Sequence, residues 1–425
     1  MARVPRQRRG GDYATAVQRA HSRTFVPIGW WALMDNIQAV ASASDLKETA
    51  ASPLPAERLP GEPAVKHSAD GLSRASAART PRRIPSLNGF RACSFLMVFG
   101  SHALSGSLIP GGLGVTVFFF LSGYLITTLM RAEYEKNATV SLRHFWLRRA
   151  LRILPPLYLV VLGSVLLALA VYPPGTVRGP AVASQLLFYA NYYHGAPGVP
   201  GTDVIWSLAV EEHFYLLFPL FYLAMQRWRL RGIHQAWLLW GLCATVLIWR
   251  YVLLMAMHAP SSRIFIGTDT RIDSILFGCA LAVWNNPVLD QPVLAPNLLK
   301  YLLLPLAIVV LLACAYVDNT VLAGTWNFSL EGVALTVLFI GAIRLHDWPL
   351  FRPLNWRPLA FIGVLSYTLY LVLDVLLKAM ARAWKLPHAS LRAALALSLS
   401  VLVAWVIYGV VEKPCARLRK QLTDW

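Results

Sequence analysis

Charged side chains are scarce in this 425-residue chain, which is 14% charged and 56% hydrophobic. An ordinary soluble domain has about a quarter of its residues charged. The mean hydropathy of +0.51 is correspondingly high. This composition excludes an ordinary soluble globular protein.

Cysteine is also rare, and none of the five cysteines belongs to a CxxC pair. Most of them lie in apolar segments, where cysteine packs as a small hydrophobic residue. The sequence therefore predicts neither a disulfide framework nor a metal site. Basic and aromatic residues are not interleaved as in a nucleic-acid reader, so no nucleic-acid partner is expected.

Long apolar runs are abundant. A helix that crosses a bilayer needs about 17–25 predominantly apolar residues. The candidate runs cover residues 86–107, 113–131, 151–172, 205–225, 236–257, 272–286, 299–316, 328–345, 361–379 and 393–411. The run at 272–286 is the weakest because it is short. We therefore expect an all-α, polytopic protein of the lipid bilayer with about ten transmembrane helices.

The remaining segments suggest a simple domain organisation. Residues 1–83 are rich in Ala, Arg, Ser and Pro, which is typical of a disordered basic tail. Residues 84–415 form one membrane domain in this interpretation, and residues 416–425 form a C-terminal tail.

Basic residues are concentrated between alternate apolar runs, at 131–152, 226–235 and 344–358. Cytoplasmic loops carry the excess of Lys and Arg, so these segments and both termini are expected in the cytoplasm, with the protein in the cell (inner) membrane. The basic segment 378–392 falls on the opposite side and does not fit the rule.

The first apolar run contains two ionisable residues, Arg91 and His102. Eleven residues correspond to about three turns plus 20°, so the two side chains share a helix face, about 16 Å apart along the axis. Ionisable groups at such depth usually face a bundle interior or a wet cavity. Arg91 could instead snorkel to the interface, and His102 could be a packed structural histidine. The functional alternative makes His102 a general base, because neutral imidazole accepts protons near neutral pH.

Two adjacent glutamates begin the fourth run. Ser207, Glu211 and Tyr215 have i, i+4, i+8 spacing and share one stripe, whereas Glu212 points about 100° away. We expect Glu211 to face this stripe. The alternative is a pair of interfacial glutamates held by backbone or arginine.

The sixth run opens with Arg271 and Asp273, which are two residues apart and do not face each other on a helix. They are candidate partners of His102 or Glu211. The alternative is that they are ordinary helix-end charges.

Three arginines stand at the mouth of the third run. Arg149 and Arg152 have i, i+3 spacing and share a face beside Arg148. Guanidinium pairs bind phosphate groups well. The alternative is plain anchoring at the cytoplasmic surface.

Seven sequence blocks follow one another along the chain: LNGFRACSFLMVFGSHA, GVTVFFFLSGYLITTLM, SLRHFWLRRALRILPPLYLV, WSLAVEEHFYLLFPL, RIDSILFGCALA, LSYTLYLV and VEKP. In this order and spacing they resemble the acyltransferase family 3 membrane proteins over about residues 84–415. That family includes O-acetyltransferases that modify lipopolysaccharide O-antigen, other surface polysaccharides, Nod factors and some macrolide antibiotics.

The resemblance implies roles for particular positions. The family's arginine-to-histidine motif falls on Arg91 and His102, and its acyl-CoA-binding arginine pair falls on Arg149 and Arg152. Its SGFL-like turn falls on residues 122–125, its WSLSVEEQFY-like block on 206–215, and its RxD block on Arg271 and Asp273. We therefore expect catalytic roles for His102, Arg91, Glu211 and Asp273, donor binding by Arg149, Arg152 and Arg148, and substrate binding by Trp206, Ser207, Glu212, Arg271 and Tyr124.

Two positions depart from the family pattern. Thr116 stands where the family often has Asp, and Leu373 followed by Asp374 stands where many members carry a histidine. An enzyme with this sequence must work without that histidine.

The resemblance implies acyl transfer, with cytoplasmic acyl-CoA (acetyl-CoA favoured) as donor substrate and no permanently bound cofactor. The acceptor would be a hydroxyl of a carbohydrate or glycosylated molecule. His102 would be the general base or the acyl carrier, and Glu211 or Asp273 would orient its ring. One rival hypothesis is a transporter or flippase whose buried charges bind a moving substrate. A second is a structural partner in an envelope complex.

Overall fold

Helices make up every long element of the computed structural model, which describes residues 84–104, 109–195, 198–316, 320–383 and 388–423. Within these ranges there is no strand, so the all-α prediction is confirmed. The predicted tail at 1–83 lies outside the described residues.

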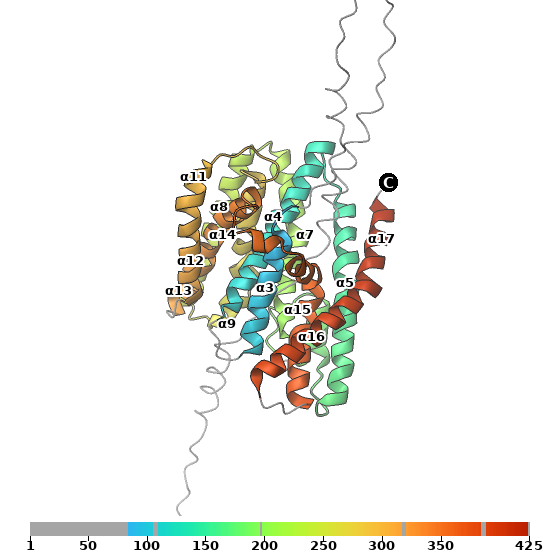
Figure 1. Ribbon diagram of the computed structural model, residues 1–425. Helices are drawn as coiled ribbons and strands as arrows, with labels where there is room; N and C mark the ends of the chain where they lie inside the picture. The colour runs from blue at the N-terminus through green and yellow to red at the C-terminus, as the bar shows by residue number, and fades with distance from the viewer. Residues whose placement is uncertain (1–83, 105–108, 196–197, 317–319, 384–387, 424–425) are drawn as a thin grey trace, which may run out of the picture.

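Within the described ranges, eleven helices of more than ten residues carry the architecture, which Figure 1 shows. They are α3 (Leu87–Ala103), α4 (Gly111–Asn137), α5 (Leu142–Val171), α7 (Trp206–Arg227), α8 (Gly232–Met255), α10 (Thr268–Val283), α12 (Leu304–Tyr316), α14 (Trp326–Arg344), α15 (Arg357–Ala383), α16 (Ala389–Ile407) and α17 (Lys413–Thr423). Shorter elements are α6 (Gly179–Leu186), α9 (Ser261–Ile266), α11 (Pro296–Leu298), α13 (Thr320–Gly324), the 3-10 turns η1 (Asp203–Ile205) and η3 (Arg352–Asn355), and the π-helical turns η2 (Leu299–Leu303) and η4 (Tyr408–Glu412).

Eight helical stretches in the described chain are long and apolar enough to cross a membrane. They coincide with eight of the predicted runs. The other two runs, at 86–107 and 272–286, fall on α3 and α10, which are 17 and 16 residues long. The predicted count of ten spans is therefore not confirmed.

Apolar segments become helices here because a helix satisfies its backbone hydrogen bonds internally, which lipid requires. Residues at the termini determine where individual helices begin and end. Ser141 caps α5, accepting a hydrogen bond from the backbone N–H of His144 at 3.4 Å. At the end of α4, Ala138 adopts a left-handed conformation with φ of 55°.

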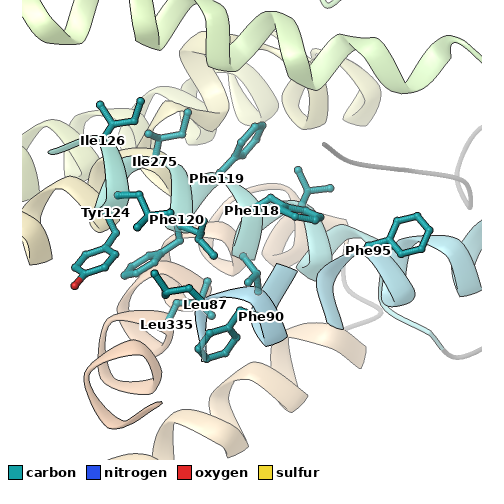
Figure 2. Close-up of a cluster of buried hydrophobic side chains, with 14 of the residues drawn as sticks. Leu87, Phe90, Phe95, Phe118, Phe119, Phe120, Tyr124, Ile126, Ile275 and Leu335 are labelled. Carbon is teal, nitrogen blue, oxygen red and sulfur yellow. The ribbon is translucent and has the colours of Figure 1, made fainter. Parts of the chain in front are cut away.

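Helix α4 lies at the centre of the bundle, with 89% of its most apolar window buried. Figure 2 shows Phe118, Phe119 and Phe120 on α4 within the buried apolar cluster. The ring of Phe339 on α14 lies 4.7 Å from that of Phe120, centroid to centroid. The ring of Phe119 lies 6.3 Å from that of Trp206 on α7, so successive aromatic side chains on α4 pack against different neighbouring helices.

Small residues bring α4 and α10 close together. A Cβ at Gly123 would overlap the backbone carbonyl of Ile275, and one at Gly278 would overlap the carbonyl of Phe120. Each glycine therefore lies directly against the other helix's backbone, as small residues do at helix contacts in membranes.

The outer helices expose apolar side chains. Leu162, Leu166 and Leu169 form one stripe on α5, with exposed fractions from 57% to 66%. Only 17% of the apolar window of 389–422 is buried. Such surfaces suit contact with lipid rather than water.

Residues 416–423, expected to form a tail, belong to α17. This helix packs against α5, and both lie on the right of Figure 1. Since α3 and α4, and then α4 and α5, are antiparallel neighbours in sequence, the starts of α3 and α5 lie at the same end of the bundle.

Candidate active site

A cavity of about 580 Å³ opens at the end of the bundle where α3 finishes. The connection between α5 and α7 supplies much of its wall, including Gln185 and Tyr193, and α15 supplies Asp374 and Lys378. His102 also lines it. The cavity therefore combines a titratable histidine with hydrogen-bonding groups in one recess, which is the usual make-up of a small-molecule site.

His102 is held by a carboxylate. Its Nδ1 lies 3.0 Å from Oδ1 of Asp374, with side-chain exposures of 9% and 6%. An ionised carboxylate only accepts hydrogen bonds, so Nδ1 carries the proton and Nε2 carries the lone pair. Nε2 is buried and has no hydrogen-bond partner among the described residues. The ring is thus oriented as a base.

A lysine holds this carboxylate from the other side. Lys378 Nζ lies 3.0 Å from Oδ2 of Asp374 and donates to Oδ2 of Asp203 at 2.7 Å. The ammonium thereby links α15 to the turn η1 that precedes α7. This arrangement fixes the position of the Asp374 carboxylate between His102 and Lys378.

The orienting partner of His102 differs from the expectation, which was Glu211 or Asp273. Asp374 is the residue beside Leu373, at the point where the family resemblance implied a histidine. The two contacting residues are 272 positions apart. Helical periodicity places a residue on a face of its own helix, but it cannot say which distant helix faces it.

Asp273 contacts another residue instead. Arg250 on α8 donates to both of its carboxylate oxygens, at 2.9 and 2.8 Å, and both side chains are fully buried. Ser329 on α14 adds a hydrogen bond at 3.1 Å. Asp273 therefore joins three helices, as a structural ion pair does. An arginine inside the apolar run 236–257 was the sequence signal for this pair, because a buried charge requires a partner.

Arg271, the other member of this motif, lies among aromatic rings. Its guanidinium carbon is 3.7 Å from the ring centre of Phe328 and 5.2 Å from that of Phe265. It also donates to the hydroxyl of Thr116 at 3.1 Å. Thr116, where the family often has Asp, is thus a neutral neighbour of this buried cation. Cation–π contacts surround Arg271, which also interacts electrostatically with the buried carboxylates of Glu331 and Asp273.

The predicted stripe on α7 is present. The Tyr215 hydroxyl lies 3.4 Å from Oε2 of Glu211 and 3.0 Å from the hydroxyl of Ser122. One helical turn before Glu211, the hydroxyl of Ser207 lies 3.2 Å from the hydroxyl of Tyr370 on α15. All of these side chains are buried. The structure thus places polar groups from α4, α7 and α15 at one helix junction.

Arginines gather at the opposite end of this stripe. Arg149 lies over the ring of Tyr215, 5.5 Å from its centre, and interacts electrostatically with Glu212. Arg152 interacts with both Arg149 and Arg91. The three arginines are at most 9% exposed, so they are not surface anchors.

Arg148 points elsewhere, pairing with Glu133 at 3.1 Å. Its neighbours Arg149 and Arg152 share the inward face, as their spacing predicted.

A polar track joins the arginines to His102. Arg91 interacts with Tyr215, and Tyr215 with Glu211. Tyr370, the next group, interacts with both Glu211 and Asp374. Polar side chains thus connect the two ends of the bundle through its interior.

The remaining predicted substrate residues separate into two groups. Trp206 lines the cavity, 5.3 Å from Phe265 between ring centres. Tyr124 is fully buried and donates to Asn286 at 3.0 Å, so it belongs to the packing of α4. Over the described ranges, no three His, Cys, Asp or Glu side chains are grouped as metal ligands would be.

Comparisons with known proteins address the family directly. The profile of a family described as an acyltransferase domain matches residues 84–409. The chain therefore belongs to this family, acyltransferase family 3. Together with the apolar helices, this membership makes it an integral membrane protein of the acyltransferase class.

Particular relatives are also similar. The peptidoglycan O-acetyltransferase OatA of Listeria monocytogenes is 32% identical over 305 residues, which cover 68% of this chain and 48% of the relative. The O-acetyltransferase OatA of Staphylococcus aureus is 31% identical over 310 residues, 69% of this chain and 50% of the relative. The chain spans about half the length of these relatives. No solved structure gives a significant match.

Proposed function

We propose that the protein is a membrane O-acyltransferase that moves an acyl group, acetyl in the first instance, from acyl-CoA to a hydroxyl of a carbohydrate acceptor. The observation that carries the proposal is the His102–Asp374 contact on the cavity wall. An imidazole held by a carboxylate on one nitrogen acts as a base through the other.

In the direct route, Nε2 of His102 takes the proton of the acceptor hydroxyl while the hydroxyl oxygen bonds to the thioester carbon. The carbon–sulfur bond breaks, and the imidazolium returns the proton to the departing CoA sulfur. Asp374 stabilises the imidazolium in between. The products are an acyl ester and a free thiol.

In the covalent route, Nε2 itself attacks the thioester carbon, and CoA leaves as a thiolate. The acceptor hydroxyl then displaces the acyl group from Nε2, which receives the hydroxyl proton and passes it to the thiolate. Both routes use one nitrogen. Quenching with denaturant at neutral pH during turnover of labelled acetyl-CoA distinguishes them, because only the covalent route leaves label on the protein and an acyl-imidazole is lost in acid.

The donor would lie at the arginine end. Arg149 and Arg152 are buried cations on one face, suited to the phosphates of CoA. Arg91 and His102 are separated by about 16 Å along α3. The extended arm of the donor would cover this distance along the polar track, with Arg91 near its path. Glu211 and Tyr215 would line the track, whereas Asp273 would support the bundle through Arg250.

The proposed topology is multi-pass in the cell membrane, with both termini and the arginines on the cytoplasmic side. The basic connection at 131–152 supports this orientation. The cavity that contains His102 would then face outward, toward the cell envelope.

The acceptor is proposed to be a sugar hydroxyl of peptidoglycan, by extension from the relatives' names. A volume of about 580 Å³ suits a small ligand, since pockets for small molecules span about 300–1,000 Å³. The side-chain oxygen of Gln185 in its wall is buried without a hydrogen-bond partner in the described chain, so it can accept from a sugar hydroxyl.

The test is transfer of labelled acetyl from acetyl-CoA by the purified full chain in detergent, with soluble peptidoglycan fragments as acceptor. We expect a labelled, alkali-labile ester on the fragments. If the protein neither consumes acetyl-CoA nor acetylates any glycan, the proposal fails. A transporter would instead move the unmodified glycan across proteoliposomes without any acetyl-CoA.

A further inference from the structure

Helix α17 contributes a further buried arginine beside Arg91, Arg149 and Arg152. Arg419 on α17 is 3% exposed. It interacts electrostatically with Arg149 and Arg152 on α5. Since α17 packs directly against α5, the last helix adds a cation to the arginine end of the polar track.

Several buried cations meet in this cluster. Arg152 interacts electrostatically with Arg91, Arg149 and Arg419, and with the carboxylate of Glu412. Glu412 also accepts a hydrogen bond from the hydroxyl of Thr368. Like charges buried together repel each other and lose their hydration, which favours a bound anion beside them.

The cluster also contains a hydrogen-bond donor without an acceptor among the described residues. Nη2 of Arg152 is buried and has no hydrogen-bond partner in the part of the chain that the structure describes. Arg152 itself is 91% buried, because its exposed fraction is 9%. A buried guanidinium with an unused N–H, next to other cations, suits a polyanionic ligand.

The inward position of Arg419 is specific within α17. Arg417 and Lys420, its basic neighbours, are exposed on the same helix. The π-helical turn η4 connects α16 to α17 and contains Glu412. The hydrogen bond from Thr368 on α15 to Glu412 holds this turn directly before α17.

We propose that α17 completes the donor site and that Arg419 binds the phosphates of the acyl-CoA. This inference rests on the proposed function, and it adds a residue from a segment that the sequence suggested was a tail. The phosphate-bearing end of the donor would lie between α5 and α17, with its thioester arm directed past Arg91.

The experiment compares Arg419→Gln with Arg417→Gln in the purified full chain. Acetyl-CoA and S-acetylpantetheine, which lacks the phosphates, serve as alternative donors. For acetyl-CoA we expect Arg419→Gln to raise KM about ten- to hundredfold, with kcat at saturation held, because a charge-assisted phosphate contact is lost. For S-acetylpantetheine the two variants should match wild type. Arg417→Gln should match wild type with both donors.

Arg419→Lys keeps the positive charge and should show an intermediate KM, which separates charge from folding. Equal KM values for acetyl-CoA in Arg419→Gln, Arg417→Gln and wild type would overturn the inference about α17 alone. A loss of equal size with S-acetylpantetheine would also overturn it, because the effect would not depend on phosphate. A wild-type protein that neither binds CoA nor consumes acetyl-CoA would instead overturn the proposed function.

Discussion

His102 on α3 and Asp374 on α15 meet across 272 residues of sequence, with Nδ1 and Oδ1 3.0 Å apart. The pair faces the cavity, and Lys378 holds the carboxylate from the far side. This is the geometry of a base with an orienting group, so replacing Asp374 should change the rate of transfer.

Asp374→Asn is expected to lower kcat about 10²- to 10⁴-fold with little change in KM for the donor. The amide no longer fixes the tautomer of His102 or stabilises its cation. Steady-state acetyl transfer measures both constants. The matched control is Asp347→Asn, whose carboxylate contacts His346 at 3.2 Å but is 89% exposed. Equal kcat values in the two variants would remove Asp374 from the mechanism.

Lys378→Gln is expected to have a smaller effect, about two- to fivefold on kcat. The ammonium is 42% exposed, so its ion pairs are screened and contribute at most about 1 kcal/mol. Lys136→Gln, at an exposed position at the other end of the bundle, should have no effect. A loss as large as that of Asp374→Asn would show that Lys378 acts directly on substrate.

Asp273→Asn is expected to destabilise the protein by about 3–5 kcal/mol, because it leaves the fully buried Arg250 without its counter-ion. Thermal unfolding in detergent measures this. Glu135→Gln is the control, since its carboxylate is 54% exposed and exposed ion pairs contribute about 1 kcal/mol at most. A variant that melts like wild type yet has lost transfer activity would restore a catalytic role for Asp273.

Gly123→Ala is expected to cost about 1–3 kcal/mol, because the new methyl group overlaps the carbonyl of Ile275 and forces α4 away from α10. Gly163→Ala is the control, since no atom lies within 4 Å of a Cβ at that position. It should leave stability unchanged or raise it by up to about 1 kcal/mol. Equal melting temperatures would contradict the close helix contact.

Several features of the site followed from sequence spacing alone. The i, i+4 relation of Glu211 and Tyr215 and the shared face of Arg149 and Arg152 appear in the structure as predicted. The apolar runs located the long helices because length and hydropathy decide that question. Such rules concern one helix at a time.

Those rules do not predict which side chains on different helices contact each other. Asp374 was noted only as the residue after an unexpected leucine, and its contact with His102 depends on how α3 and α15 pack. Arg419 lies in a segment whose composition suggested a tail, and only the packing of α17 on α5 buries it. Periodicity gives the direction of a side chain, whereas its partner depends on the tertiary arrangement.

The most direct test of the account is the rate of acetyl transfer from labelled acetyl-CoA by His102→Gln, beside wild type and His346→Gln. His346 also contacts an aspartate but is 43% exposed, so it matches the substitution without sharing the cavity. The account predicts a loss of about 10³-fold or more for His102→Gln and none for His346→Gln. Wild-type transfer by His102→Gln would contradict it.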